Sequence, residues 1–225
     1  MNRLMTAILV LIFSAFSLVP VAAIAADNSA PEKLTELYNN TVFPLWGSRE
    51  DKEPLCAISY LSTERLDIFN EKVERSFLVS AGHCGGGALR LSESFEYIVA
   101  VLVTVTTGTH DELIASAFDW RERITYFGPP RPPRSGEVAY TGRTLMRSDG
   151  ATELQRLKFI GQSKAAKSLL FRGEVPIRKG MSGSPVISAD GEFLGIVVRM
   201  HPTDSYLYEA ITAETVMRTL LFARE

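Results

Sequence analysis

The feature that most constrains the fold of this chain is a long succession of short runs rich in β-branched and aromatic residues, separated by Gly, Pro and Asp. Strand-sized runs at intervals of roughly 8–12 residues are typical of all-β sandwiches and barrels. The helical patterns that a βαβ order requires between strands are missing from these intervals. We therefore predict an all-β fold with strands at 77–80, 97–105, 112–118, 124–127, 137–141, 154–160, 168–172, 185–188, 193–200 and 206–211.

Helical spacing is found near the two ends of this β region. Residues 212–223 place apolar side chains at positions 213, 216, 217, 220 and 221, which favours a C-terminal helix. Thr212 is a good N-cap residue for that helix. The stretch 31–39 is interpreted as a short amphipathic helix or as an arm lying on the body.

The N-terminus has the pattern of a secretory signal peptide. One positive charge at Arg3 precedes an apolar run over residues 4–26, which ends in the small-x-small sequence Ala23-Ile24-Ala25. We predict cleavage after Ala25, a secreted or periplasmic protein, and no stable membrane insertion after cleavage. The alternative is an uncleaved membrane anchor, although Pro20 shortens the helix available to it.

Charge and cysteine content exclude several classes of function. Lys and Arg number 24 against 26 Asp and Glu, so a basic surface for nucleic acid is not expected. Two exported cysteines, Cys56 and Cys84, are most simply interpreted as one disulfide. With three scattered His and no HExxH sequence, we predict no metal site and no cofactor.

A proline-rich stretch, GPPRPPRSG at 128–136, divides the β region. Two Pro pairs forbid a central strand and favour an extended connection, although PPRPPR also resembles a polyproline ligand. We expect a signal peptide at 1–25, an arm or propeptide at 26–54, a first β-barrel at 55–128 and a linker at 129–135. A second barrel with the C-terminal helix would occupy 136–225.

Two short motifs could carry chemistry. In GMSGSP, residues 180–185, glycine on both sides of Ser182 allows a turn whose N–H groups point at a reacting carbonyl. A Gly/Ser hairpin with no catalytic role is the alternative. In FLVSAGHC, residues 77–84, an apolar strand delivers His83 to a fixed point, and Cys84 can tie that turn to another strand.

VSAGHC and GMSGSP resemble the His and Ser motifs of trypsin-like (chymotrypsin-fold) serine proteases, especially the bacterial HtrA-type and glutamyl-endopeptidase-type enzymes. The resemblance covers 55–225 and implies two six-stranded antiparallel β-barrels with the catalytic residues between them. It implies that Ser182 is the nucleophile, that His83 is the general base and then acid, and that Gly180 and Ser182 supply the oxyanion hole. Cys56 and Cys84 would match the family's disulfide beside the His.

The acidic member of the triad is less constrained by the sequence. Asp111 precedes the run Glu112 to Ala115 and resembles the family's Asp at a strand entrance, whereas Asp119 precedes Trp120. We favour Asp111, because enough chain must follow the Asp to build further strands before the linker. Either residue could instead be a solvated turn carboxylate.

The resemblance also assigns a substrate-pairing strand and exposes departures from the family pattern. Val198, Arg199 and Met200 would pair with substrate, and Val198 lacks the polar side chain that often supports the catalytic Asp. Met181 stands where activated zymogens keep an Asp, so activation by N-terminal insertion is not expected.

Primary specificity follows from three further positions. Pro176 and Val197 stand where enzymes selective for basic and acidic residues carry Asp and His. Met200 stands where a Gly usually opens the pocket. A restricted, apolar primary pocket is therefore expected.

The leading hypothesis is an exported serine endopeptidase that cleaves proteins or peptides through an acyl-enzyme. The alternative from another class is a catalytically silent protease-fold protein that binds a partner through the same cleft. An α/β-hydrolase is disfavoured, because its nucleophile elbow would need Gly where Ser184 stands and its His far beyond the Ser. From the short stretch that follows Ser182, a PDZ-like second domain is not expected.

Overall fold

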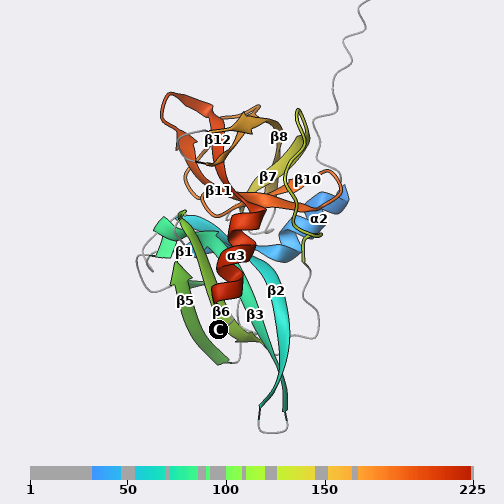
Figure 1. The fold of residues 1–225 in the computed structure, drawn as a ribbon, viewed down its shortest axis with the longest axis vertical. Coiled ribbons are helices and arrows are strands. Elements are labelled where there is room, and N and C mark those ends of the chain that lie inside the picture. Colours follow the sequence, from blue (N-terminus) through green and yellow to red (C-terminus); the bar gives the residue numbers. More distant parts are fainter. Residues whose placement is uncertain are drawn as a thin grey trace, which may run out of the picture.

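The computed structural model describes residues 32–46, 54–68, 71–85, 90–91, 100–107, 110–119, 126–144, 152–163 and 167–223. These residues form two six-stranded β units, one above the other in Figure 1, and two helices that lie near the place where the units meet. The predicted all-β fold with a C-terminal helix is confirmed. The predicted signal peptide lies outside the described residues. Among the helices that are described, none has the length and apolar character needed to cross a membrane.

The first unit is an antiparallel sheet with strand order β4-β1-β2-β3-β6-β5. The strands β2 and β3 are much longer than their neighbours and continue as a two-stranded ribbon at the bottom of Figure 1. The elements are β1 (Val42–Trp46), β2 (Cys56–Ile68), β3 (Glu71–Ala81), the 3-10 turn η1 (Gly82–Gly85), β4 (Arg90–Leu91), β5 (Ala100–Thr107) and β6 (Glu112–Asp119).

The second unit is a closed barrel with strand order β10-β11-β12-β9-β8-β7, and β10 returns to pair with β7. In β9, Leu169 and Phe171 are buried while Arg172 is exposed, so one face of the strand points into the barrel. The strands are β7 (Val138–Thr144), β8 (Thr152–Gln162), β9 (Leu169–Gly173), β10 (Pro185–Ser188), β11 (Phe193–His201) and β12 (Asp204–Thr212).

The run at 124–127 is not a strand where the structure describes it. Tyr126 and Phe127 lie in irregular backbone, and the first two residues of the run fall outside the described ranges. The Phe127 ring packs between Tyr38 and Phe193, with centroid distances of 6.2 and 6.3 Å. The prolines that follow Gly128 cannot donate to a ladder, so the chain continues as an extended connection. That connection lies along the second barrel, where Arg131 N–H donates to the Phe193 carbonyl at 3.1 Å.

Two helices join the units. In α2 (Glu32–Thr41), the fully buried Tyr38 hydroxyl donates to the carbonyl of Gly142 in β7 and accepts from its N–H, at 3.1 and 3.0 Å. The helix α3 (Ala213–Ala223) follows the second barrel but lies across the first sheet (Figure 1). Thr212 caps it as predicted, because its Oγ1 accepts the Thr215 N–H at 3.1 Å.

Candidate active site

His83 and Asp111 meet at one edge of the first sheet. Because β3 and β6 pair with Ala81 opposite Glu112, the residue that follows β3 and the residue that precedes β6 come together. The His83 backbone N–H donates to Oδ1 of Asp111 at 2.8 Å, and His83 Nδ1 lies 2.7 Å from Oδ2. An ionised carboxylate can only accept, so this geometry favours the neutral tautomer in which Nδ1 carries the proton and Nε2 keeps the lone pair.

The turn that presents Asp111 has unusual backbone. Asp111 has φ of 67°, in the left-handed region that few residues other than glycine adopt. Its carbonyl accepts the Gly82 N–H at 2.5 Å, and a Cβ on Gly82 would lie 3.0 Å from the Asp111 carboxylate. Glycine at this position therefore lets the two turns approach each other.

Glu112 holds the same turn from the interior. Its side chain is buried, its Oε2 accepts the His110 backbone N–H at 2.9 Å, and its Oε1 accepts the Thr219 hydroxyl of α3 at 2.8 Å. Glu112 is not among the site residues predicted from the sequence. An acidic residue opening an otherwise apolar strand was the available signal.

Asp119, the other candidate acid, lies at the opposite end of β6. Its backbone pairs with Glu74, far along β3 from the end that leads into His83. Of the two candidates, Asp111 is the one in hydrogen-bonding contact with His83.

Ser182 lies in a tight turn between β9 and β10. Gly180 and Gly183 have φ of 89° and 82°, so the turn uses backbone conformations that side chains oppose. The Ser184 N–H donates to the Met181 carbonyl at 3.0 Å, and the fully buried Met181 anchors the turn in the core of the second barrel. Met181, at the position where the resemblance to trypsin-like proteases would place the Asp of activated zymogens, is thus an apolar anchor.

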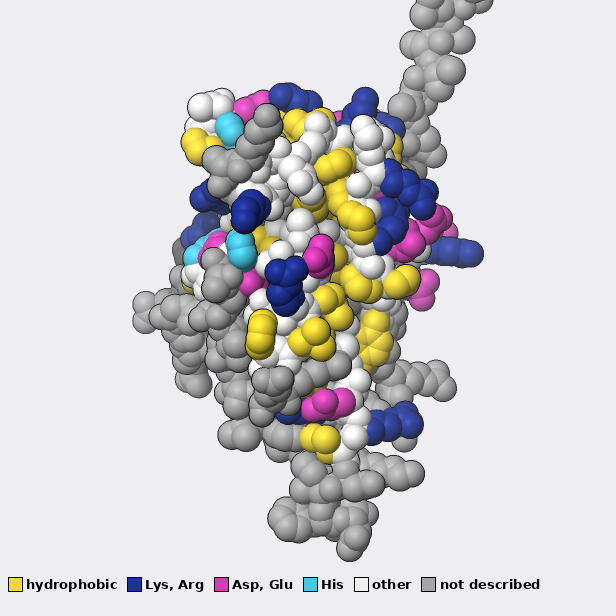
Figure 2. Space-filling view, in the orientation of Figure 1, with side chains coloured by type: hydrophobic (Ala, Val, Ile, Leu, Met, Phe, Trp, Pro, Cys, Tyr) yellow, Lys and Arg dark blue, Asp and Glu magenta, His cyan; other side chains and the backbone are white. Residues whose placement is uncertain are grey.

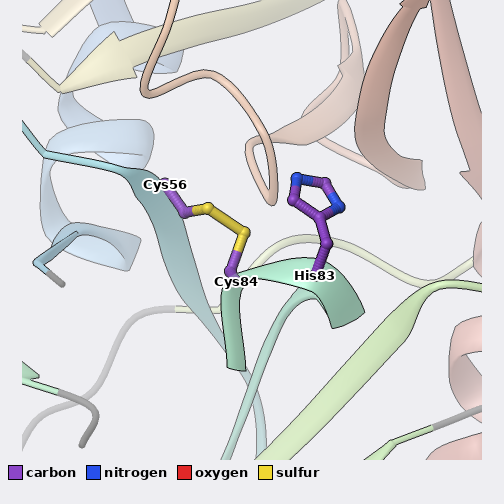
Figure 3. A group of neighbouring side chains, drawn as sticks. All are labelled: Cys56, His83 and Cys84. Atoms are coloured by element: carbon purple, nitrogen blue, oxygen red, sulfur yellow. A yellow bond between two sulfur atoms is a disulfide. The ribbon is translucent and has the colours of Figure 1, made fainter. Parts of the chain in front are cut away.

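The Ser182 turn is docked on the first sheet beside His83. The Ser182 carbonyl accepts the Ala57 N–H at 2.7 Å, and Cys56, the preceding residue, is disulfide-bonded to Cys84. Figure 3 shows the His83 ring standing next to this disulfide, with a pale-orange loop of the second barrel approaching it. The disulfide joins the start of β2 to the turn that carries His83, and the hydrogen bond joins the same end of β2 to the Ser182 turn.

The hydroxyl of Ser182 is not hydrogen-bonded to His83, although both residues are described. Ser182 Oγ instead lies 3.4 Å from the Val198 carbonyl, a long contact for a hydroxyl donor. The His83 and Asp111 side chains are 47% and 41% exposed. Catalytic hydrogen bonds of unliganded enzymes often lengthen in this way and tighten when substrate excludes water.

Two backbone N–H groups of the Ser182 turn remain available to a ligand. Among the backbone hydrogen bonds of the described residues, none is donated by Gly180 or Ser182. The neighbouring Gly183 N–H is occupied, since it donates to the Val197 carbonyl at 2.7 Å. These are the two N–H groups that the resemblance assigns to an oxyanion hole, and neither is used by a described backbone acceptor.

Cys56, His83 and Cys84 also form the metal-type cluster found among the described residues. Both sulfur atoms are bonded to each other, so neither is a thiolate that could bind a cation.

The residues expected to pair with substrate lie along β11. Val198 is buried in the core shared by the two units, while Arg199 and Met200 are exposed. Val197 points into the second barrel. Glu209 of β12, which the sequence analysis did not identify, is buried and accepts Arg199 Nε at 2.7 Å; a lone acid within the apolar run of β12 was the signal available.

A scan against protein-family models found no match, and a sequence search of curated proteins also found none. Solved structures do match. The serine endoprotease from Yersinia pestis aligns with a TM-score of 0.61 at 13% identity, covering 85% of this chain and 65% of that one. An inactive serine-to-alanine mutant of Rv3671c from M. tuberculosis aligns with a TM-score of 0.59 at 14% identity, covering 88% and 94%.

The HtrA-type protease AlgW with a bound tripeptide aligns with a TM-score of 0.59 at 12% identity, covering 85% of this chain and 62% of AlgW. This chain thus spans less than two thirds of AlgW and of the Yersinia enzyme. At these identities the likeness shows a chymotrypsin-like fold, whose structural neighbours are HtrA-type and trypsin-like serine proteases.

Proposed function

We propose that the protein is an exported serine endopeptidase that cleaves peptide bonds with Ser182, His83 and Asp111. The observation that carries the proposal is that both carboxylate oxygens of Asp111 are hydrogen-bonded to His83, which leaves Nε2 as the basic nitrogen. The chymotrypsin-like fold and the docking of the Ser182 turn beside this pair support it.

The proposed reaction begins when Ser182 Oγ attacks the scissile carbonyl and His83 Nε2 takes the hydroxyl proton. The N–H groups of Gly180 and Ser182 bind the resulting oxyanion. The C–N bond then breaks, and His83 returns the proton to the leaving amine. Water then attacks the acyl carbon while His83 Nε2 takes its proton. The ester bond to Ser182 Oγ breaks, His83 returns the proton to that oxygen, and the new carboxylic acid leaves.

A second candidate is a silent protease fold that binds a partner. It is favoured by the separation of the Ser182 hydroxyl from His83 and by the apolar residues Met181 and Val198 at positions that are often polar in active relatives.

A fluorophosphonate probe separates the two candidates, because it adds covalently only to an activated serine. We expect the purified protein to gain the mass of one probe and the Ser182→Ala and His83→Ala variants to stay unlabelled. A Ser205→Ala variant, altered in a strand of the second barrel, is the matched control and should label normally. A folded protein that does not label would reject the endopeptidase proposal in favour of the silent fold.

A further inference from the structure

A cavity of about 440 Å³ opens next to the proposed catalytic pair. Its walls come from the Asp111 turn, from the chain entering β9, from β11 and β12, and from α3. On the face that carries α3, basic, acidic and histidine side chains gather where the two units meet (Figure 2). The lining of this cavity includes the charged residues Asp111, Lys167, Arg199, Glu209 and Arg218.

The cavity lies beside an edge to which an extended peptide can add. The pairing of β10 with β11 ends at Ile196, whereas Arg199 and Met200 pair with β12 on their other side. No other described strand covers this end of β11. A peptide added antiparallel here makes main-chain hydrogen bonds to β11 and places alternate side chains in neighbouring pockets. With its scissile bond at Ser182, the residues that run past Arg199 are those N-terminal to the cut.

Arg199 is held ready for an anionic partner. Its Nε donates to Oε2 of Glu209 at 2.7 Å, and the Glu209 side chain is only 5% exposed while that of Arg199 is 60% exposed. Neither terminal nitrogen of the guanidinium makes a hydrogen bond within the described part of the chain. A guanidinium fixed through Nε presents its remaining N–H groups as a planar fork, which fits a carboxylate.

The other charges around the cavity favour the same ligand. Lys167 is exposed and forms no ion pair with any described residue, while Arg218 is engaged with Glu214 at 2.8 Å. The acids in the lining are already occupied, because Asp111 accepts from His83 with both oxygens and Glu209 accepts from Arg199. The groups of the lining that are still free to bind a ligand are therefore mostly the N–H donors of Arg199 and Lys167.

We propose that this cavity is a substrate subsite for an acidic side chain located two to four residues N-terminal to the scissile bond, with Arg199 binding the carboxylate and Lys167 adding charge. The proposal rests on the proposed endopeptidase function. It concerns a secondary subsite and is independent of the apolar pocket expected for the residue at the cut itself.

The test is a cleavage profile on a diverse peptide library, comparing the protein with Arg199→Gln, Lys167→Gln and a Lys158→Gln control on the exposed face of β8. We expect Asp and Glu to be enriched at one of these positions. For a matched pair of substrates with Glu or Gln at that position, we expect a ratio of kcat/KM of about 10 or more in the protein and the control. The ratio should fall toward 1 in Arg199→Gln and partly in Lys167→Gln.

Arg199→Gln leaves the buried Glu209 without its cation, so its fold is checked by thermal melting. If that variant does not fold, Lys167→Gln decides, because Lys167 is exposed and has no structural partner to lose among the described residues. A profile without acidic enrichment, or an enrichment unchanged in the variants, would overturn the proposal.

A second measurement separates this proposal from the catalytic one. The Ser182→Ala protein, which needs no catalysis, is used to select binders from the same library. If no cleavage occurs but acidic peptides are selected in an Arg199-dependent way, the subsite stands and the endopeptidase proposal fails. If the protein cleaves peptides but acidic residues are not selected, the endopeptidase proposal stands and the subsite proposal fails.

Discussion

Asp111 contacts His83 at two points: Oδ1 accepts the backbone N–H at 2.8 Å, and Oδ2 faces Nδ1 at 2.7 Å. The first contact fixes the turn and the second fixes the ring and its tautomer. A carboxylate serves both, because all its lone pairs accept. A change of one carboxylate oxygen therefore disturbs either the turn or the ring of His83.

Replacing Asp111 by Asn should therefore remove activity with little effect on the fold. The amide can accept through one atom only, and its NH₂ facing Nδ1 favours the wrong tautomer, so we expect kcat to fall by about 10⁴. Steady-state peptide hydrolysis and near-UV circular dichroism measure the two effects. Asp119→Asn, at the opposite end of β6, is the control and should keep full activity. If Asp119→Asn were the inactive variant, our assignment of the acid would be wrong.

Glu112 should act as a positioning residue for the Asp111 turn. Its buried carboxylate binds the His110 N–H and the Thr219 hydroxyl, so Glu112→Gln loses one of the two acceptors that support the left-handed Asp111. We expect kcat to drop roughly tenfold at unchanged KM, as for a general base slightly misplaced.

Thr219 offers a second way to test this support. Thr219→Val leaves one Glu112 oxygen buried without its donor and should cost about 1–3 kcal/mol of stability. Thr219→Ser keeps the hydroxyl and should restore both kcat and stability. A loss in Thr219→Ser with none in Thr219→Val would show that packing of the methyl group matters and that the hydrogen bond does not.

Gly183 should not tolerate any side chain. A Cβ there would lie 2.1 Å from the Ala57 carbonyl oxygen and 2.4 Å from Ser80 Oγ, in addition to the strain of a φ of 82°. We expect Gly183→Ala to separate the Ser182 turn from β2, with loss of fluorophosphonate labelling and a lower melting temperature. Gly136→Ala is the matched control, since Gly136 has φ of 72° but no atom within 4 Å of the added Cβ. It should cost only about 1 kcal/mol and leave labelling intact.

The second barrel was easier to predict from the sequence than the first sheet, for physical reasons. In β10 and in most of β11 the side chains are buried, so these strands appear as continuous apolar runs. Beyond Ser59, the described partner of β2 is β3 alone, and the residues of β2 from Ser62 onward are mostly polar, which hides the strand. The strand β1 lies in the stretch 26–54 that was expected to be an arm or propeptide. Its Pro44 is tolerated because β4 pairs with Leu45 and Trp46, and no described strand pairs with Pro44 on that side.

The site residues also differ in how far the sequence alone could predict them. His83 and Ser182 stand in short motifs whose glycines and cysteine are local requirements, so the sequence alone indicated them. Glu112, in contrast, is hydrogen-bonded to Thr219, which is 107 residues away in the sequence. Contacts over such separations are set by the packing of α3 on the first sheet, and no local pattern records them.

The helix α2 should be a permanent part of the folded protein. Tyr38 is fully buried, burial raises the pKa of its phenol to about 12, and its hydroxyl satisfies both backbone groups of Gly142. The Gly142 carbonyl also accepts the Ser184 hydroxyl at 2.8 Å, two residues from Ser182. Tyr38→Phe should therefore cost about 1–3 kcal/mol in urea unfolding, because a buried N–H loses its acceptor. Tyr206→Phe, at a 43% exposed position, is the control and should be neutral. An unchanged midpoint in Tyr38→Phe would contradict this role.

The linker should make stability depend on pH through Arg131. Its guanidinium contacts Glu137 and Glu192, both at 2.5 Å, and these hydrogen bonds hold the pKa of each carboxyl below the ordinary value of 4.5. Because the pKa is lower in the folded than in the unfolded protein, this stabilisation is present above about pH 4.5 and is lost as pH falls through the folded values. Arg131→Gln should lower the urea midpoint more at pH 7 than at pH 3. Arg156→Gln, which removes an exposed ion pair with Glu174, should change neither midpoint appreciably. An Arg131→Gln deficit of equal size at both pH values would mean that Arg131 stabilises the linker by packing and not by its charge.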